Sequence, residues 1–143
     1  MKTNKAAIDL ICKDISVLKS EPEIKPGYLY PIIGHGHYAA DSVGIYNHAL
    51  EDHGEFTKDD ARKLLKDDLV RFEAIVERDC RHLKLNADQF SALVVYTYIN
   101  GRGSLLSLIR NKTKKNICDS LTGKVKTIYK KGDKDNGKSD DNG

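Results

Sequence analysis

The sequence predicts an α+β fold in which a β-hairpin is set between helices, one of them long enough to join two lobes. Apolar residues recur at helical spacing in three segments, 5–18, 57–82 and 86–99. A turn signal and an apolar run predict the hairpin at residues 24–37. With 143 residues, the chain has the commonest size of one domain and can bury a core without disulfides.

The first predicted helix covers residues 5–18 and is amphipathic. Asn4 is placed to cap its first turn, and charged residues fall on other faces than the apolar ones. The apolar residues at helical spacing are Ile8, Ile11, Ile15 and Leu18. Because Asp9, Lys13 and Asp14 interrupt the segment, the N-terminus lacks the pattern of a secretory signal. We therefore expect synthesis in the cytoplasm without a signal peptide.

The stretch from Tyr28 to Tyr38 organises the chain and has the sequence Tyr-Leu-Tyr-Pro-Ile-Ile-Gly-His-Gly-His-Tyr. Its first half predicts a buried strand that follows a turn at residues 26–27. Glycine then alternates with histidine, which predicts that His35 and His37 share one strand face while something approaches the other face closely. Two interpretations stay open: histidines that hydrogen-bond within the core, or a strand that receives a ligand.

Residues 39–55 are small and polar, and they predict a long loop or a third short strand. The clearest helix start follows, because Thr57 and Asp60 have the spacing of a capping box. Helical periodicity continues to about His82, so this helix would span roughly 40 Å at 1.5 Å per residue. That length is sufficient to join two lobes.

A second capping box, Asn86 and Gln89, opens a helix with almost no polar face, which we expect to be central and buried. The sequence Asn-Gly-Arg-Gly at 100–103 ends this helix, and a short helix is expected from Ser104. Residues 131–143 consist of Lys, Ser, Asp, Asn and Gly and predict a solvated polar tail.

Composition limits the classes of function. The 24 Lys and Arg residues are interspersed with 21 Asp and Glu residues, which argues against a dedicated nucleic-acid binder. A net charge of +3 would still help the protein approach an anionic cell wall. No apolar run reaches the roughly 18 residues of a membrane span. Cys12, Cys80 and Cys118 fit buried free thiols better than disulfides or zinc ligands, and no cofactor is predicted.

Three sequence blocks occur in a fixed order after the first helix. They are Ile33-Gly34-His35-Gly36-His37-Tyr38, then Thr-x-x-x-Ala-x-x-Leu-Leu-x-x-Asp-Leu at 57–69, then Leu-Asn-Ala-Asp-Gln-Phe-Ser-Ala-Leu-Val at 85–94. A Gly-x-Gly motif comes after them. This order resembles the phage-type lysozymes, the bacteriophage endolysin family of muramidases, over roughly residues 5–112.

The resemblance implies a lysozyme-like domain at residues 1–130, in which a sugar chain lies in a cleft between two lobes. The small hairpin lobe would cover about 15–56, and the helical lobe about 57–130 together with the first helix. The resemblance also implies a structural pair, His37 and Asp68, that ties the hairpin to the long helix and raises the pKa of the histidine. A solvated charge is the alternative for Asp68.

The catalytic positions depart from the family pattern. Glycoside hydrolysis needs two carboxyl groups, and the family places Glu-Gly at the end of the first helix with an Asp nine residues later. Aligned on the turn at 26–27, Asp14 and Glu23 keep that spacing with the two acids exchanged. Aligned on the hairpin's acidic cluster, Glu21 becomes the candidate acid. The family's Thr position holds Ile32, and ordinary surface acids are the alternative for all three carboxylates.

Three hypotheses for function follow. The first is an active muramidase that cleaves the β-1,4 bond between N-acetylmuramic acid and N-acetylglucosamine, giving cell wall lysis and antimicrobial activity. The second is a catalytically degenerate lysozyme-fold protein that binds peptidoglycan or a protein partner. The third is a hydrolytic metal site built from His35, His37 and one of His48 and His53.

Under the first hypothesis, two of Asp14, Glu21 and Glu23 act as acid and as base or stabiliser. The residues expected to line the sugar groove are Tyr28, Tyr30, Tyr98, Asn100 and Arg102. The arginine-rich C-terminal segment of the family has no counterpart in residues 113–143. We expect a monomer that reaches the cell wall after release or delivery.

Overall fold

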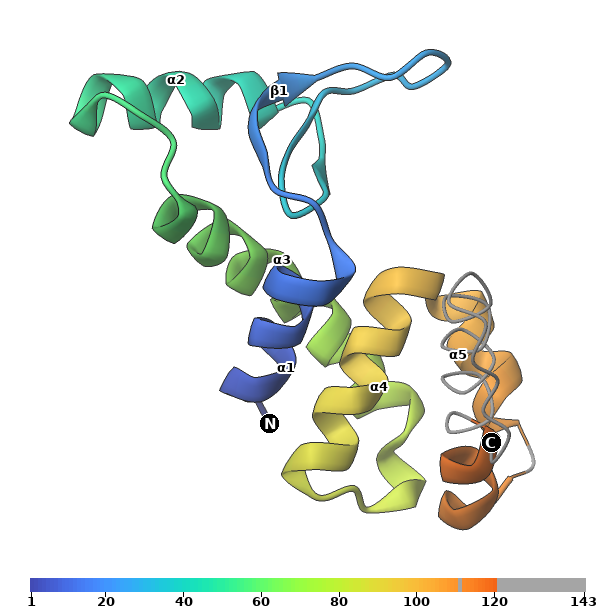
Figure 1. The fold of residues 1–143 in the computed structure, drawn as a ribbon. Helices are drawn as coiled ribbons and strands as arrows, with labels where there is room; N and C mark the ends of the chain where they lie inside the picture. The colour runs from blue at the N-terminus through green and yellow to red at the C-terminus, as the bar shows by residue number, and fades with distance from the viewer. Residues whose placement is uncertain (111, 121–143) are drawn as a thin grey trace, which may run out of the picture. The chain divides into compact units, whose positions relative to one another are not determined.

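The computed structural model describes residues 1–110 and 112–120. The chain divides into two compact units, Met1–Gly101 and Arg102–Gly143 (Figure 1). Helices and one small antiparallel sheet make up the described residues, so the predicted α+β class is confirmed. The predicted polar tail at 131–143 lies outside the described residues, and a single domain up to residue 130 stays a prediction.

The N-terminal helix is shorter than predicted. Its first part, α1, Lys5–Leu10, is capped by Asn4, whose side chain accepts a backbone N–H of the first turn at 3.0 Å. The helix continues as one π-helical turn, η1, Ile11–Ile15, and ends at Ser16. It ends there because the amide and the hydroxyl of Ser16 both donate to the carbonyl oxygen that begins η1, at 2.9 and 3.0 Å. Leu18 therefore lies beyond the helix and packs against the hairpin core.

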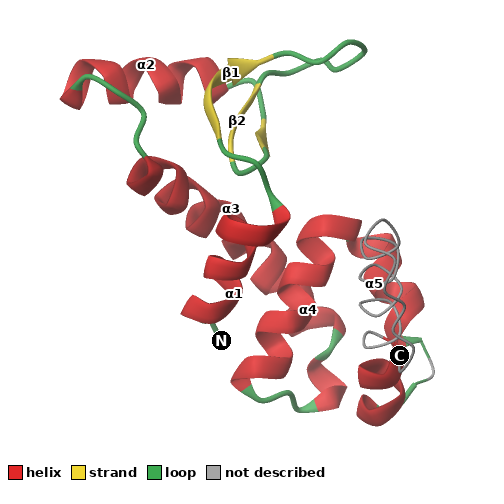
Figure 2. Cartoon of the chain, in the orientation of Figure 1, coloured by secondary structure: helices red, strands yellow, loops and turns green. Residues whose placement is uncertain are grey.

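A three-stranded antiparallel sheet follows, in the order β1, β2, β3. The strands are β1, Lys19–Glu23, β2, Ile32–Gly34, and β3, His37–Tyr38. Lys19 pairs with Gly34 and Glu23 pairs with Ile32. Between these two pairs the chain advances by four residues along β1 but by only two along β2. β1 therefore bulges by two surplus residues. The loop between β1 and β2 extends away from the sheet (Figure 2).

Only the end of the predicted buried strand is a strand. Residues 28–31 lie in an exposed loop, where the side chain of Leu29 is 81% exposed. Pro31 has no N–H to donate to a strand partner, and the N–H of Tyr28 bonds within the turn to the oxygen of Lys25 at 3.0 Å. The predicted buried strand is therefore wrong for these four residues.

The alternation of glycine and histidine forms a turn. Gly34 and Gly36 have φ angles of 68° and 98°, in the left-handed region that favours glycine. His35 therefore lies in the turn between β2 and β3, and the prediction that it shares a strand face with His37 is wrong. The close approach to this backbone is confirmed, because a Cβ atom on Gly36 would lie 3.0 Å from the hydroxyl oxygen of Tyr98.

The helix α2, Ser42–His53, replaces the loop or third strand predicted for residues 39–55. Ile45 and Ala49 lie one helical turn apart and pack in the hairpin core with Ile33. Most of the other α2 side chains are polar or exposed. The apolar stripe of α2 is thus too narrow to give a clear helical pattern in the sequence.

The long helix is α3, Lys58–Asp79, and its predicted capping box between Thr57 and Asp60 is confirmed. Its 22 residues correspond to about 33 Å at 1.5 Å per residue, which is shorter than expected. The reason is that the helix ends at Cys80, and a 3-10 turn, η2, Arg81–Leu83, takes the place of its last turn.

The central helix of the first unit is α4, Ala87–Asn100, and its predicted capping box between Asn86 and Gln89 is confirmed. α3 contacts β2 and β3 on one side and α4 on another, so it connects the hairpin to the helical part of this unit (Figure 1). α1 also contacts α4. The buried residues of α4 are Phe90, Ser91, Leu93, Val94, Val95 and Thr97.

The second unit begins with α5, Arg102–Ile109, two residues before the start predicted at Ser104. Residues 114–120 are also helical. Within the part of the chain that the structure describes, no helix combines the length and the apolar character needed to cross a bilayer.

Candidate active site

The three candidate carboxylates lie at the start of the hairpin. Asp14 is on η1, whereas Glu21 and Glu23 are on β1. All three residues are exposed. The side chains of Asp14 and Glu21 form no hydrogen bond or ion pair with any residue that the structure describes. Within the described part of the chain, neither carboxylate is therefore held by a polar contact that stabilises the fold.

Glu21 lies in the middle of the β1 bulge, between Ser20 and Pro22. Pro22 cannot donate a hydrogen bond to a neighbouring strand, which favours an irregular pairing at this point. A bulge re-aims the side chains that it carries, and bulges are frequent next to active sites. The hairpin thus presents Glu21 at a position that strand pairing does not require.

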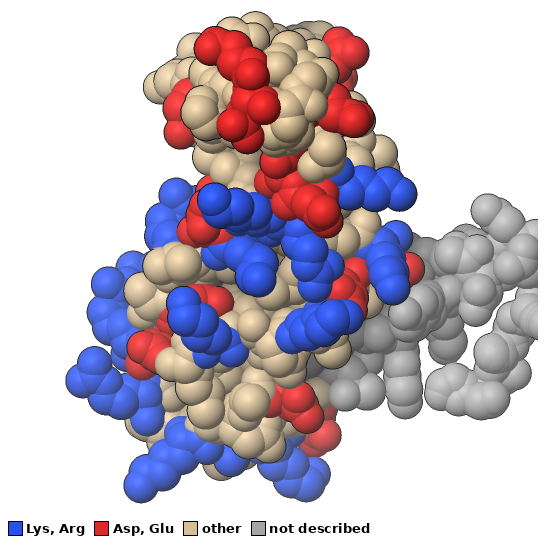
Figure 3. All heavy atoms as spheres, turned by 90° about the vertical axis from the view of Figure 1, so that its left-hand side faces the viewer, with Lys and Arg blue, Asp and Glu red and all other residues tan. Residues whose placement is uncertain are grey.

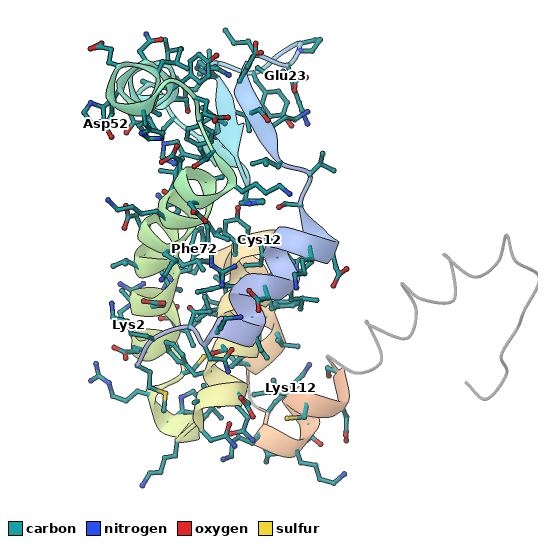
Figure 4. All side chains as sticks on the ribbon, turned by 60° about the vertical axis from the view of Figure 1, so that its left-hand side comes forward. Lys2, Cys12, Glu23, Asp52, Phe72 and Lys112 are labelled. Carbon is teal, nitrogen blue, oxygen red and sulfur yellow. The ribbon has the colours of Figure 1, made fainter. Side chains whose placement is uncertain are left out.

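Glu23, at the end of β1, is held as a carboxylate. The ammonium nitrogen of Lys19 lies 2.5 Å from a carboxylate oxygen of Glu23. This hydrogen bond lowers the pKa of Glu23 below its usual value. A general acid needs a raised pKa, so Glu23 suits the ionised member of a carboxyl pair. Figure 4 shows Glu23 on the hairpin, at the same end of the first unit as Asp52 on α2.

His37, on β3, is held between two carboxylates. Its Nδ1 lies 2.8 Å from Oδ2 of Asp68 on α3, and its Nε2 lies 2.7 Å from Oδ1 of Asp41. Burial alone lowers the pKa of His37 and is the largest single influence, but the hydrogen bonds to Asp41 and Asp68 together outweigh it and raise the pKa. The structure thus brings His37 and Asp68 together and adds Asp41.

His35, in the turn between β2 and β3, is buried and joins three elements. Its Nδ1 lies 2.6 Å from Oγ of Ser16 at the end of η1, and its backbone oxygen accepts a hydrogen bond from the hydroxyl of Tyr98 on α4. Burial lowers the pKa of His35, and the positive charge of Arg62 lowers it further. The imidazole is therefore neutral at pH 7 and holds the turn against the helices.

The histidines do not form a metal site. His35 and His37 have separate hydrogen-bond partners, and His53 lies 3.0 Å from Asp52 and 2.7 Å from Asp60. Among the described residues, no three His, Cys, Asp or Glu side chains are placed to hold a metal ion. The described residues therefore do not assemble the histidine set on which the third hypothesis depends.

The residues expected to line a sugar groove do not form one set. Tyr28 and Tyr30 are exposed on the loop between β1 and β2. Tyr98 packs edge-on against a phenylalanine of α3, and burial raises its pKa to about 12. Asn100 is exposed and donates to a backbone oxygen of α4 at 3.1 Å. Arg102 is the first residue of α5, in the second unit.

Four residues around these groups were not predicted from the sequence. Lys19 stands four residues before Glu23, and Asp41 four residues after His37, so opposite charges at short spacing were an available signal. Ser16 and Tyr38 gave no such signal. Their partners, His35 for Ser16 and residues 28–30 for Tyr38, are more distant in the sequence than one helical turn.

Charges are unevenly distributed over the first unit. Residues 39–55 contain no Lys or Arg, and Figure 3 shows Asp and Glu side chains gathered at the end of the unit where α2 lies. Residues 24–38 contain no Asp or Glu. An anionic polymer is therefore repelled by the α2 region and not by this part of the hairpin. The acidic residues of 39–55 are Asp41, Glu51, Asp52 and Glu55.

The fold, with a hairpin tied to a long helix through His37 and Asp68, fits the class of lysozyme-like proteins. A family model described as Phage lysozyme matches residues 17–137, and the chain belongs to that family. The resemblance to phage-type lysozymes is thereby confirmed, and the fold is lysozyme-like. Comparisons with curated proteins and with solved structures give no match. Membership indicates a peptidoglycan-hydrolysing enzyme that acts on the cell wall.

The matched segment begins after η1 and continues beyond residue 112, where the resemblance seen in the sequence ends. Glu21, Glu23 and the contact between His37 and Asp68 fall inside it. Asp14 precedes the matched segment. Of the three candidate carboxylates, only the two on β1 therefore belong to the part of the chain that carries the family pattern.

Proposed function

We propose that the chain is an active muramidase that hydrolyses the β-1,4 bond between N-acetylmuramic acid and N-acetylglucosamine. Glu21 is the general acid, and Glu23 is the ionised carboxylate. The acid protonates the leaving oxygen, while the carboxylate activates water or stabilises the positive charge that develops on the sugar. Asp14 is the alternative acid. The protein would act as a monomer on the cell wall, after release or delivery.

The observation that carries this proposal is the placement of two glutamates on one bulged strand within the matched segment. Lys19 holds Glu23 ionised, whereas Glu21 is paired with none of the described residues. The two glutamates thus differ in their surroundings, which suits a division of roles between an acid and a base or stabiliser.

The raised pKa that an acid needs would come from the substrate. Glu21 is exposed in the free protein. A glycan strand lying on the hairpin would displace water from this carboxyl group, and desolvation raises the pKa of a carboxylic acid. Binding of the glycan would therefore prepare Glu21 to donate its proton.

The remaining predicted residues would support this chemistry. We propose that His37 and Asp68 are a structural pair that keeps the hairpin on α3. Tyr28 and Tyr30 would pack against the sugar rings. Tyr98 would act indirectly, because its hydroxyl is already bonded to the hairpin turn. The proposed polar contact to the sugar within the first unit is Asn100.

The test is the release of reducing ends from purified peptidoglycan, together with the loss of turbidity of permeabilised Gram-negative cells. We expect Glu21→Gln and Glu23→Gln to lose activity by about a hundredfold or more, because each removes a group that acts on the reacting bond. Asp14→Asn is expected to retain activity. Glu51→Gln, which alters an exposed acid on α2, is the matched control.

Two outcomes would change the proposal. If Asp14→Asn abolishes activity and Glu21→Gln does not, the general acid is Asp14. If the folded wild-type protein releases no reducing ends at high concentration, the hydrolase proposal fails.

A second function, glycan or protein binding without catalysis, is favoured by one feature of the site. Ile32 stands where the family has Thr, and all three candidate acids are exposed in the free protein. A degenerate protein of this kind would leave peptidoglycan intact and would still sediment with it.

A further inference from the structure

Three tyrosines form a cluster on the hairpin, which we call the tyrosine cluster: Tyr28, Tyr30 and Tyr38. The ring centroids of Tyr28 and Tyr38 are 5.5 Å apart with an interplanar angle of 81°, and those of Tyr30 and Tyr38 are 5.4 Å apart at 57°. The three residues are 49%, 42% and 44% exposed. Tyr38 therefore contacts both other rings, and all three keep a large solvent-exposed surface.

Tyr38 also fixes the backbone of the loop. Its hydroxyl oxygen accepts a hydrogen bond from the N–H of Leu29, the residue between the other two tyrosines, at 3.0 Å. The turn before them is closed by the N–H of Tyr28, which donates to the oxygen of Lys25 at 3.0 Å. A loop that is already held in one conformation loses less entropy when it binds a ligand. Tyr38 thus preorganises the tyrosine cluster.

The chemistry of the tyrosine cluster suits a saccharide. Aromatic rings offer a flat apolar surface to the C–H face of a pyranose, and tyrosine hydroxyls can hydrogen-bond to sugar hydroxyls. The segment 24–38 has no Asp or Glu that would repel the acidic groups of peptidoglycan, and Lys25 adds a positive charge 6.0 Å from the ring of Tyr28. The cluster also lies on the same hairpin as the candidate acids, Glu21 and Glu23.

We propose that Tyr38 is a positioning residue for glycan binding, which holds Tyr28 and Tyr30 in the arrangement that packs against a pyranose ring of a peptidoglycan strand. Tyr38 acts through the other two tyrosines and takes no part in bond cleavage. The inference rests on the proposed function for the class of ligand, a glycan of N-acetylated sugars. It does not require that the protein hydrolyse this glycan.

The test measures the dissociation constant of the full chain for peptidoglycan strands freed of their peptides, with KM and kcat for hydrolysis in parallel. Tyr38→Phe removes the hydroxyl that accepts from Leu29 and should weaken binding about threefold to tenfold. Tyr38→Leu also removes both ring contacts and should weaken binding by more than about tenfold. We expect KM to rise in both variants while kcat stays unchanged.

Two controls separate positioning from a loss of stability. Tyr46→Phe removes the hydroxyl of an α2 tyrosine that packs in the hairpin core, and it should bind glycan like the wild type. In a chain that already carries Tyr28→Ala and Tyr30→Ala, Tyr38→Phe should cause no further loss of binding, because it acts through these two rings. A further loss of the same size in that background, or unchanged binding by Tyr38→Phe alone, would overturn the proposal.

The outcomes distinguish this inference from the proposed function. If glycan binding depends on Tyr38 but no reducing ends are released, the inference about Tyr38 is supported and the proposed hydrolytic function is contradicted. If Tyr38→Phe hydrolyses the glycan with an unchanged KM, the inference about Tyr38 is contradicted and the proposed hydrolytic function is supported. Sedimentation with phosphatidylglycerol vesicles instead of glycan, lost in Tyr38→Leu, would assign the tyrosine cluster to a membrane surface and overturn the proposal.

Discussion

The two ends of the hairpin are held in different ways. At the base, the turn between β2 and β3 is fixed by other elements, since Asp68 on α3 holds His37 and the hydroxyl of Tyr98 on α4 holds the backbone of His35. At the tip, residues 24–30, the hydrogen bonds and ring contacts come from within the hairpin. The base therefore belongs to the fold of the first unit, whereas the tip is free to serve binding.

The largest expected effect is a difference in unfolding free energy between two variants, each of which truncates an apolar residue at one end of the hairpin. Ile33 is fully buried at the base, so Ile33→Ala should lower the free energy of unfolding by about 2 to 5 kcal/mol. Leu29 is 81% exposed at the tip, so Leu29→Ala should change it by no more than about 0.5 kcal/mol. Urea unfolding of the two variants gives both values. Equal losses would mean that the tip is as much a part of the core as the base.

An intermediate effect is expected at the contact between His37 and Asp68. Asp68→Asn should lower the free energy of unfolding by about 1 to 3 kcal/mol near pH 6, where the pair is charged. The neighbouring Asp67 is exposed and has no partner among the described residues, so Asp67→Asn is a matched control that should have little effect. Urea unfolding at fixed pH checks both values.

This contact should also make stability depend on pH. The pKa of His37 is raised above 6.5 in the folded state, so the folded protein binds the proton more tightly than the unfolded chain does. The stabilisation is complete below about pH 6.5 and is lost as the pH rises through the folded pKa. Asp68→Asn should therefore flatten the fall of stability above pH 6.5. His53 has a raised pKa as well and contributes a similar fall in both proteins. An unchanged pH profile would show that Asp68 does not control His37.

The smallest expected effect concerns one hydroxyl group. Tyr98→Phe removes the donor to the backbone oxygen of His35 and should cost about 1 kcal/mol of unfolding free energy. Tyr30→Phe, at the tip, removes a hydroxyl without a partner among the described residues and should cost nothing measurable. Thermal unfolding of the two variants side by side would show the difference. A stable Tyr98→Phe would mean that packing alone holds the base of the hairpin.

Local signals in the sequence were sufficient for the features whose causes are local. The capping boxes that open α3 and α4 each depend on two residues three apart, and both were predicted correctly. The close approach to Gly36 was also predictable, since a glycine in an apolar segment signals a backbone that something contacts. The sequence could not show that this neighbour is Tyr98, because the two residues are far apart in the chain.

Features that depend on tertiary partners were predicted poorly. The run from Tyr28 to Pro31 looked like a buried strand, but burial requires a second layer, and Tyr38 supplies only a surface contact. The helix α2 was missed because one narrow stripe around Ile45 and Ala49 fixes it against the core. The sequence alone left three candidate acids for a similar reason, since the alignment of the hairpin depends on a bulge that the sequence does not reveal.

The surplus of two residues in β1 has a consequence for how this hairpin can change over time. Strand pairing is regained on both sides of the bulge, so residues 20–22 can be exchanged without shifting the register of Lys19 or Glu23. The pairing that maintains the fold thus does not constrain which residue stands at the position of Glu21. Such a segment can gain, move or lose an acid while the scaffold stays recognisable.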